Sequence, residues 1–164
     1  VIDVEKGRTA LGIHIMVGQH HTVFMADTTV NERPTAHELA DIAEQTAAVA
    51  RQMGHEPRVA FLSYSTFGNP EGRWLENLAP DVALNPKLMA NYPFSRLSQP
   101  ANVLVMPGLQ SANLSAKLLR ELGGDSVIGP MLVGLEKSVQ IATMASSASE
   151  LVTLAVLAAS GIAK

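Results

Sequence analysis

Hydroxyl and carboxylate side chains gather in the stretch VQIATMASSASELV, residues 139–152, which holds Thr143, three serines and Glu150. A serine hydroxyl becomes a nucleophile for acyl transfer when a neighbouring base takes its proton. No histidine is near this stretch in sequence, so a histidine base would have to approach from a distant part of the chain. Ser147-x-x-Glu150 is also a capping box, the pattern that begins a helix. The sequence leaves both roles of Glu150 open.

A second candidate is SYSTFGNPEG, residues 63–72, directly after an apolar run of strand length. Ligands of open α/β sheets bind beyond the carboxyl ends of the strands. Ser65 and Thr66, with a glycine-rich backbone, offer donors that could cradle a phosphate. The alternative is a solvated turn. Because neither G-x-G-x-x-G nor a Walker A pattern is present, we expect no NAD or FAD site here.

Weaker candidates lie elsewhere along the chain. Asn113 follows Ser111 at a strand-to-helix junction, where Ser111 is expected to cap the helix. Lys137 is a surface cation that comes just before the hydroxyl-rich stretch. His20 and His21 are expected to face solvent in a hairpin loop. With no H-E-x-x-H spacing in the sequence, we predict no metal site.

The elements that must position these groups alternate between strand and helix patterns. A hairpin is expected from residues 9–17 and 22–26, and a capped helix from Thr35 to Gly54. Buried strands are expected at 58–64, covered on both faces, at 81–84 and at 102–106. A helix at 111–122, short extended segments at 126–135 and 137–142, and a last helix from about Ser147 complete the prediction. The pattern predicts a three-layer α/β/α sandwich with a mostly parallel sheet.

Composition narrows the class of protein. The chain has 164 residues, 47% of them hydrophobic, which suffices for one core. Its net charge of −3 argues against a general nucleic-acid surface, and its longest apolar run, 13 residues, is too short to cross a membrane. The absence of cysteine fits a reducing compartment, and we expect a cytoplasmic protein. Because the chain begins at Val1, we expect a fragment of a longer protein.

Several blocks in order carry a family resemblance: DTTVNERPTAHELADIAEQTAAVARQMGHEPRVAFLSYSTFG, then PANVLVMPGLQSANLSAKLLRELGG and VIGPMLVGLEKSVQI. They resemble the C-terminal half of phosphate acetyl/butyryltransferases. The residues of these blocks are most similar to those of the phosphotransacetylase-like domain of hybrid NADP-dependent malic enzymes. The resemblance implies an isocitrate dehydrogenase/phosphotransacetylase-like fold, with about one subdomain present in 1–164. It also implies that a segment near 72–79 is shortened or missing.

In active members of the family, a serine-arginine pair precedes the last helix, and an aspartate follows six residues after the arginine. The resemblance places Thr143, Met144 and Glu150 at these three positions. A methionine has no charge and no donor with which to stabilise the reacting acyl phosphate. The resemblance therefore implies a catalytically retired domain that senses acetyl-CoA or coenzyme A and regulates an attached malic enzyme.

Further expectations follow from the resemblance. The candidate ligand residues are Ser65, Thr66, Asn113, Lys137 and Thr143. NADP and a divalent metal are expected only in an absent N-terminal catalytic part. One alternative is an active phosphate acyltransferase with a rescuing cation such as Lys137. Another is a purely structural oligomerisation module, because the apolar helix at 148–160 could pack on a second copy of the chain.

Overall fold

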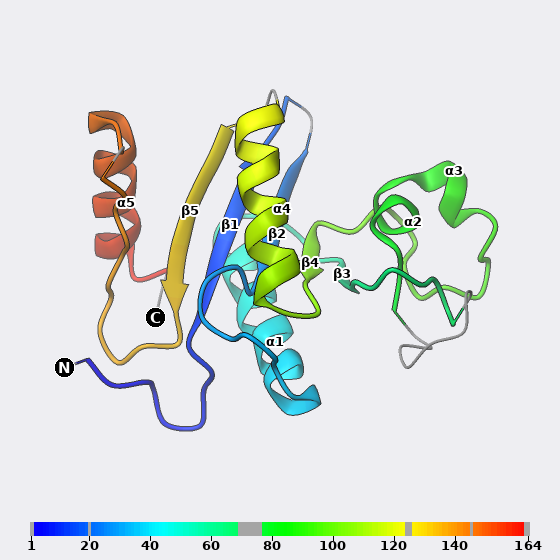
Figure 1. Ribbon diagram of the computed structural model, residues 1–164, viewed down its shortest axis with the longest axis horizontal. Coiled ribbons are helices and arrows are strands. Elements are labelled where there is room, and N and C mark those ends of the chain that lie inside the picture. The colour runs from blue at the N-terminus through cyan, green and yellow to red at the C-terminus, as the bar shows by residue number, and fades with distance from the viewer. Residues whose placement is uncertain (1, 20, 69–76, 124–125, 145, 163–164) are drawn as a thin grey trace.

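The computed structural model describes residues 2–19, 21–68, 77–123, 126–144 and 146–162. Within these ranges one sheet of five strands has the order β3-β4-β2-β1-β5. The strands are β1 Leu11–Val17, β2 Thr22–Ala26, β3 Val59–Phe61, β4 Val103–Val105 and β5 Ser126–Val133. β3 and β5 therefore form the two opposite edges of the sheet, as Figure 1 shows.

Helices connect and cover the strands. They are α1 Ala36–Gln52, α2 Pro80–Leu84, α3 Pro86–Met89, α4 Leu109–Leu122 and α5 Ala148–Ser160. Both predicted capping boxes form. The Thr35 hydroxyl accepts from the N–H of Glu38 at the start of α1, and Ser147 and Glu150 do the same for α5. Each cap satisfies N–H groups that have no partner inside the helix.

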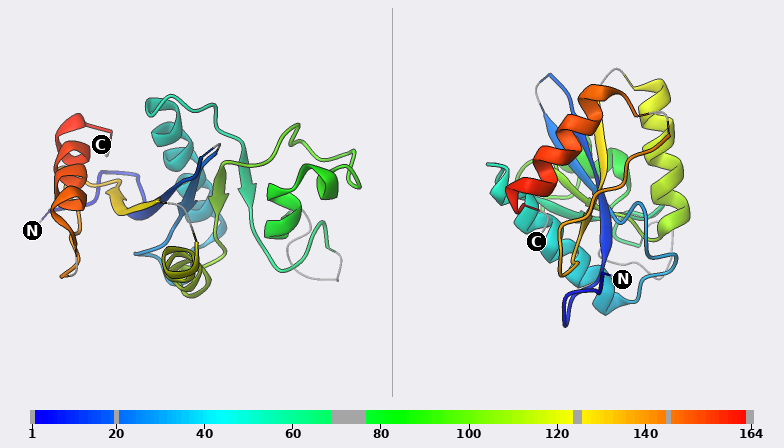
Figure 2. Two further views of the ribbon diagram at one scale, coloured as in Figure 1. Left: turned by 90° about the horizontal axis from the view of Figure 1, so that it is seen from above. Right: turned by 90° about the vertical axis from the view of Figure 1, so that its left-hand side faces the viewer.

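α1 and α4 lie on opposite faces of the sheet, as the right-hand view of Figure 2 shows. One apolar cluster joins α1 to the β1 side chains at 11, 13 and 15, and Leu157 of α5 belongs to it. A second cluster joins Ala112 and Ala116 of α4 to the other face of β2 and β4. Because strand side chains alternate between the faces, one sheet supplies both cores. The layered α/β architecture is confirmed.

The sheet is mixed rather than mostly parallel. β2 pairs with β4, and β4 with β3, in parallel. β1 pairs antiparallel with both β2 and β5. The β1–β2 hairpin was expected from the sequence. The antiparallel return of β5 was not, because an apolar run does not reveal the direction of its neighbour.

Two expected strands differ in the structure. Residues 81–84 belong to α2, whose first residue is Pro80 and whose first turn carries Asp81, both favourable at a helix start. A short apolar run is compatible with helix as well as strand. β3 is an edge strand, and Phe61 is 36% exposed, so it is not covered on both faces.

Two boundaries also shift. α4 begins at Leu109 with Gly108 as its N-cap, so Ser111 lies inside the first turn and donates its hydroxyl to the Gly108 carbonyl. Residues 137–142 form no strand, although Gln140 makes an isolated bridge to Met131. Of the segment expected to be shortened, residues 72–76 lie outside the described residues.

Candidate functional site

The loop after β2 is organised by one buried carboxylate. Asp27, 1% exposed, accepts hydrogen bonds from the backbone N–H groups of Gly12, Thr29, Val30 and Asn31, at 2.7 to 3.3 Å. The Asn31 side-chain amide donates to it as well, at 2.6 Å. Hydrogen bonds from this many donors offset the cost of burying a charged carboxylate. The loop at the carboxyl end of β2 is therefore held in one conformation.

Next to Asp27, Thr28 links three elements. Its hydroxyl donates to the Gly12 carbonyl at 3.0 Å and lies 2.7 Å from Nδ1 of His14 on β1. Asn113 of α4 donates its side-chain amide to the Thr28 carbonyl at 3.1 Å. Asn113, a predicted ligand residue, thus serves to tie α4 to this loop. Its ligand role stays a prediction.

His14 is a buried histidine on the α4 side of the sheet. Burial, and secondly the positive charge of Arg120, lower the pKa of His14 from 6.5 to about 4. The imidazole is therefore neutral at physiological pH. Arg120 is the cation that acts on this imidazole.

β5 contains a bulge opposite His14. Ile13 faces Met131 and Ile15 faces Ile128, so Gly129 and Pro130 together oppose one residue of β1. Gly129 has a φ of 120°, a region that favours glycine, and an added Cβ would lie 2.6 Å from the Ile13 carbonyl oxygen. The Gly129 carbonyl accepts a 3.0 Å hydrogen bond from Nη2 of Arg120. The bulge thus anchors the arginine of α4.

Arg120 lines a small cavity together with two of the predicted site residues. The cavity has a volume of about 90 Å³, lies between α4, β5 and α5, and is bordered by Thr143 and Glu150. Ser146, Ser149 and Thr153 add three hydroxyls to its wall. The structure therefore brings Thr143 and Glu150 together, as the sequence suggested. It adds a cation that sequence reasoning missed, since nothing about an arginine in the last turn of a helix distinguishes it from a surface residue.

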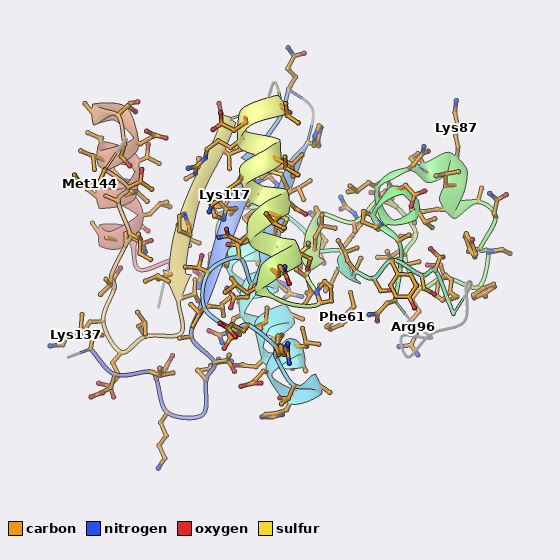
Figure 3. The ribbon with its side chains drawn as sticks, viewed as in Figure 1. Phe61, Lys87, Arg96, Lys117, Lys137 and Met144 are labelled. Atoms are coloured by element: carbon orange, nitrogen blue, oxygen red, sulfur yellow. The ribbon has the colours of Figure 1, made fainter. Side chains whose placement is uncertain are left out.

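Met144 and Lys137 do not belong to this cavity. Met144 is fully exposed, at 106% of its reference area. Lys137 is also exposed, and the two residues lie at opposite ends of the segment between β5 and α5 (Figure 3). Lys137 is therefore not placed to supply the cation that position 144 lacks.

Glu150 is committed to the start of α5. Its Oε2 accepts from the N–H of Ser147 at 2.6 Å and from the Ser147 hydroxyl at 2.9 Å. The backbone hydrogen bond, the hydroxyl of the same serine and the charge of Arg120 lower the pKa of Glu150. The group is thus ionised at neutral pH. The capping role that the sequence left open is the one that the structure shows.

Ser65 and Thr66 lie at the other edge of the sheet. Both are buried, and the Thr66 hydroxyl accepts from the N–H of Ala79 at 3.0 Å. They follow β3, whereas Thr143 and Glu150 follow β5, and four strand spacings of about 4.8 Å separate these edges by about 19 Å. One compact group cannot touch both sets within this chain.

A larger cavity, of about 1070 Å³, lies on the α4 side of the sheet. It is bordered by Met25 of β2, Leu104 of β4 and Leu118 of α4, and it extends to Leu84 of α2. Among the described residues, none of the predicted ligand residues borders this cavity. Within the same parts, no helix is long and apolar enough to cross a membrane.

The family model described as phosphate acetyl/butaryl transferase matches residues 1–80 and 76–159. The chain belongs to the phosphate acetyl/butaryl transferase family. The phosphotransacetylase of Streptococcus pyogenes has the same fold, with a TM-score of 0.90 and 31% identity over 99% of this chain. The match covers 56% of that structure.

Two kinds of relative carry this transferase-family domain. The NADP-dependent malic enzyme of Rhizobium meliloti is 49% identical over 96% of this chain, and the match covers 23% of that enzyme. The phosphate acetyltransferase of Clostridium acetobutylicum is 32% identical over 84% of this chain, covering 48% of that protein. The chain thus spans about a quarter of the malic enzymes that it matches and about half of the transferases. In the malic enzyme relatives, this family domain is one part of a larger protein.

Proposed function

We propose that this chain is a catalytically retired phosphotransacetylase-like domain that regulates an NADP-dependent malic enzyme in response to acetyl-CoA. Malate oxidation, with NADP and a divalent metal, belongs to an N-terminal part in this proposal. The whole protein is cytoplasmic and oligomeric in the same proposal. The proposed attachment to a malic enzyme is supported by the 49% identity to a malic enzyme in which the matched domain is only one part.

The observation that carries the loss of catalysis is the environment of Met144. The side chain is fully exposed and has no group that stabilises negative charge. The neighbouring Thr143 keeps its hydroxyl, but Ser146 engages it at 3.0 Å. Removing one placed donor from a transition state typically lowers the rate by about 10²–10³.

The hydrogen bonds and lowered pKa of Glu150 also support the proposed loss of catalysis. A general base near neutral pH is most effective when its pKa lies close to the working pH. The hydrogen bonds from Ser147 lower the pKa of Glu150 and occupy one of its oxygens. The carboxylate is therefore a weak base that stabilises a helix.

Regulation requires that acetyl-CoA bind one arrangement of the whole enzyme more tightly than another. Such coupling commonly amounts to about 1–3 kcal/mol. Acetyl-CoA would then change the malate reaction without any acyl transfer. Ser65, Thr66, Asn113, Lys137 and Thr143 stay the predicted ligand residues, and their separation across the sheet favours an extended ligand over a compact one.

The test uses the full-length protein that contains this domain. NADP reduction by malate is followed while acetyl-CoA is titrated, with coenzyme A and acetyl phosphate as comparisons. We expect acetyl-CoA to change the rate saturably and the protein to form no acetyl-CoA from acetyl phosphate and coenzyme A. An unchanged malate reaction despite calorimetrically measured acetyl-CoA binding would contradict regulation, and measurable acyl transfer would contradict retirement.

Two other functions have an observation in their favour. An active acyltransferase would use Arg120, which shares a cavity with Thr143 and Glu150, as its cation. An oligomerisation module would use the outer face of α5, where Val152 and Val156 are more than 60% exposed. The transfer assay separates the first from regulation. Concentration-dependent dissociation without any response to acetyl-CoA would support the second.

A further inference from the structure

One side of α1 packs on β2 and β4, and the other side is exposed. The exposed side carries residues that follow one another at spacings of three or four: Ala40, Glu44, Ala48 and Arg51. On a helix of 3.6 residues per turn, these positions lie along one line. We call these four residues the outer face of α1.

A groove lies along the outer face of α1. Its volume is about 650 Å³, and all four residues of the outer face line it. Val59 and Phe61 of the edge strand β3 line it as well. Phe61 is 36% exposed, and Figure 3 shows it beside β3. Because aromatic side chains are enriched in the cores of protein interfaces, this groove has features of a docking surface.

Glu44 and Arg51 are opposite charges that lack an ion-pair partner inside the chain. Among the described residues, the ion pair found is Arg8–Asp41, at 3.2 Å. Seven positions separate Glu44 from Arg51, which corresponds to about 10 Å along the helix axis. The two side chains therefore point to the same side of α1, one about two turns beyond the other, and each can pair with a charge on a partner.

The order of these charges is self-complementary. In an antiparallel pair of α1 helices with a two-fold axis between Ala47 and Ala48, Glu44 of each copy faces Arg51 of the other. Symmetry then makes the two ion pairs identical. The side chains at the axis are methyl groups, so the two helices can approach closely there. A single face thus supplies both signs of charge at matching distances.

We propose that a second copy of this chain docks on the outer face of α1, helix antiparallel to helix, with reciprocal Glu44–Arg51 ion pairs. Charge complementarity favours a second copy over an unrelated partner, because the face complements itself. Val59 and Phe61, which line the same groove, add apolar area to the contact. The inference goes beyond acetyl-CoA sensing and does not rest on it, and the surface is separate from α5.

Disulfide cross-linking of the full-length protein locates the contact. These 164 residues contain no cysteine, and the wild type gives the background from the rest of the protein. Ala48→Cys places two thiols beside the two-fold axis, within reach of a disulfide. Ala36→Cys, at the exposed start of the same helix, is the matched control. Under mild oxidation, we expect Ala48→Cys to form a linked dimer at least about tenfold faster than Ala36→Cys.

Charge reversal tests the ion pairs by sedimentation equilibrium. Glu44→Arg and Arg51→Glu each bring like charges together, so each variant alone should associate through α1 at least about tenfold more weakly than wild type. An equimolar mixture of the two variants should associate again, because one copy then carries two bases and the other two acids. The double variant Glu44→Arg/Arg51→Glu should associate like wild type.

Lys87→Glu supplies the control for charge reversal. Lys87 is an exposed cation of α3 that does not line the groove. Its reversal should change the association by less than about twofold. Because this contact involves about two helix turns from each copy, it is smaller than a standard interface, and we expect a dissociation constant on the order of tens of micromolar.

Three outcomes would overturn the proposal: Ala48→Cys cross-links no faster than Ala36→Cys, the mixed variants fail to associate, or Glu44→Arg and Lys87→Glu weaken association equally. Slow thiol labelling of Ala48→Cys without cross-linking would show that another part of the full-length protein covers α1, which also contradicts docking of a second copy. Thermal unfolding of every variant is recorded alongside. If a charge-reversed variant is misfolded, the two cysteine variants still decide between the outcomes.

Discussion

Nδ1 of the buried His14 lies 2.7 Å from the hydroxyl oxygen of Thr28, which in turn donates to the Gly12 carbonyl at 3.0 Å. The Thr28 hydrogen is thus directed to the carbonyl, and the imidazole donates from Nδ1 to the Thr28 oxygen. The histidine on β1 and the loop after β2 are joined through this one hydroxyl. Burial and the charge of Arg120, rather than this contact, keep the imidazole neutral.

Stability should therefore depend on pH through His14. Its pKa is lowered from 6.5 to about 4, so the unfolded state binds more protons between these values. The stabilisation is present above pH 6.5 and is lost as the pH falls towards 4. The loss amounts to about 3 kcal/mol at most. Denaturant unfolding of wild type and His14→Gln across this range should show a flatter profile for the variant.

The exposed His37 of α1 supplies the control. His37→Gln should keep the pH profile of the wild type. If His14→Gln and His37→Gln give the same profile, then His14 is not the group responsible.

Asp27→Asn should destabilise the protein strongly. The carboxylate accepts from four backbone N–H groups and one side-chain amide, and an asparagine would turn an N–H₂ group towards some of these donors. Leaving buried donors without acceptors costs about 1–3 kcal/mol each, so we expect a loss of about 3 kcal/mol or more. The measurement is the free energy of unfolding in urea.

The same loss of charge at an exposed aspartate serves as the comparison. Asp3 is exposed, and Asp3→Asn should change the free energy of unfolding by less than about 0.5 kcal/mol. Equal effects at the two positions would mean that net charge matters and the Asp27 network does not.

Gly129→Ala should cost more than an ordinary glycine substitution. The new Cβ would lie 2.6 Å from the Ile13 carbonyl oxygen, and the φ of 120° is strained for alanine. Gly7 has a φ of 80° but nothing within 4 Å of an added Cβ. Gly7→Ala therefore reports the backbone strain alone. We expect Gly129→Ala to lose at least about 1 kcal/mol more than Gly7→Ala in thermal or urea unfolding, and similar losses would contradict the close contact at the bulge.

Met144→Arg should restore part of an acyl-transfer site if the missing cation is what retired it. A placed donor contributes about 10²–10³ in rate, so the variant should form acetyl-CoA from acetyl phosphate and coenzyme A about 10²-fold faster than wild type. Met144→Leu, which restores no charge, should stay at the wild-type level. An arginine variant that is no faster than the leucine variant would show that loss of charge at 144 is not the limiting defect.

The sequence by itself determined the features that depend on neighbouring residues. Thr35 and Glu38, like Ser147 and Glu150, are three positions apart, and each pair closes its helix start wherever the helix lies. The β1–β2 hairpin and the buried β4 follow from local apolar patterns in the same way. The blocks of family resemblance are likewise a property of the sequence, and the family match confirms them.

Tertiary structure decided what depends on distant neighbours. The antiparallel return of β5, the edge position of β3 and the helix at 80–84 follow from which segments pack together. The bulge at Gly129 exists only against β1, and it directs Arg120 of α4 towards the cavity of Thr143 and Glu150. A charge on one helix and a carboxylate on another have no fixed spacing in sequence. Only the packing of α4 and α5 around β5 brings the two to one cavity.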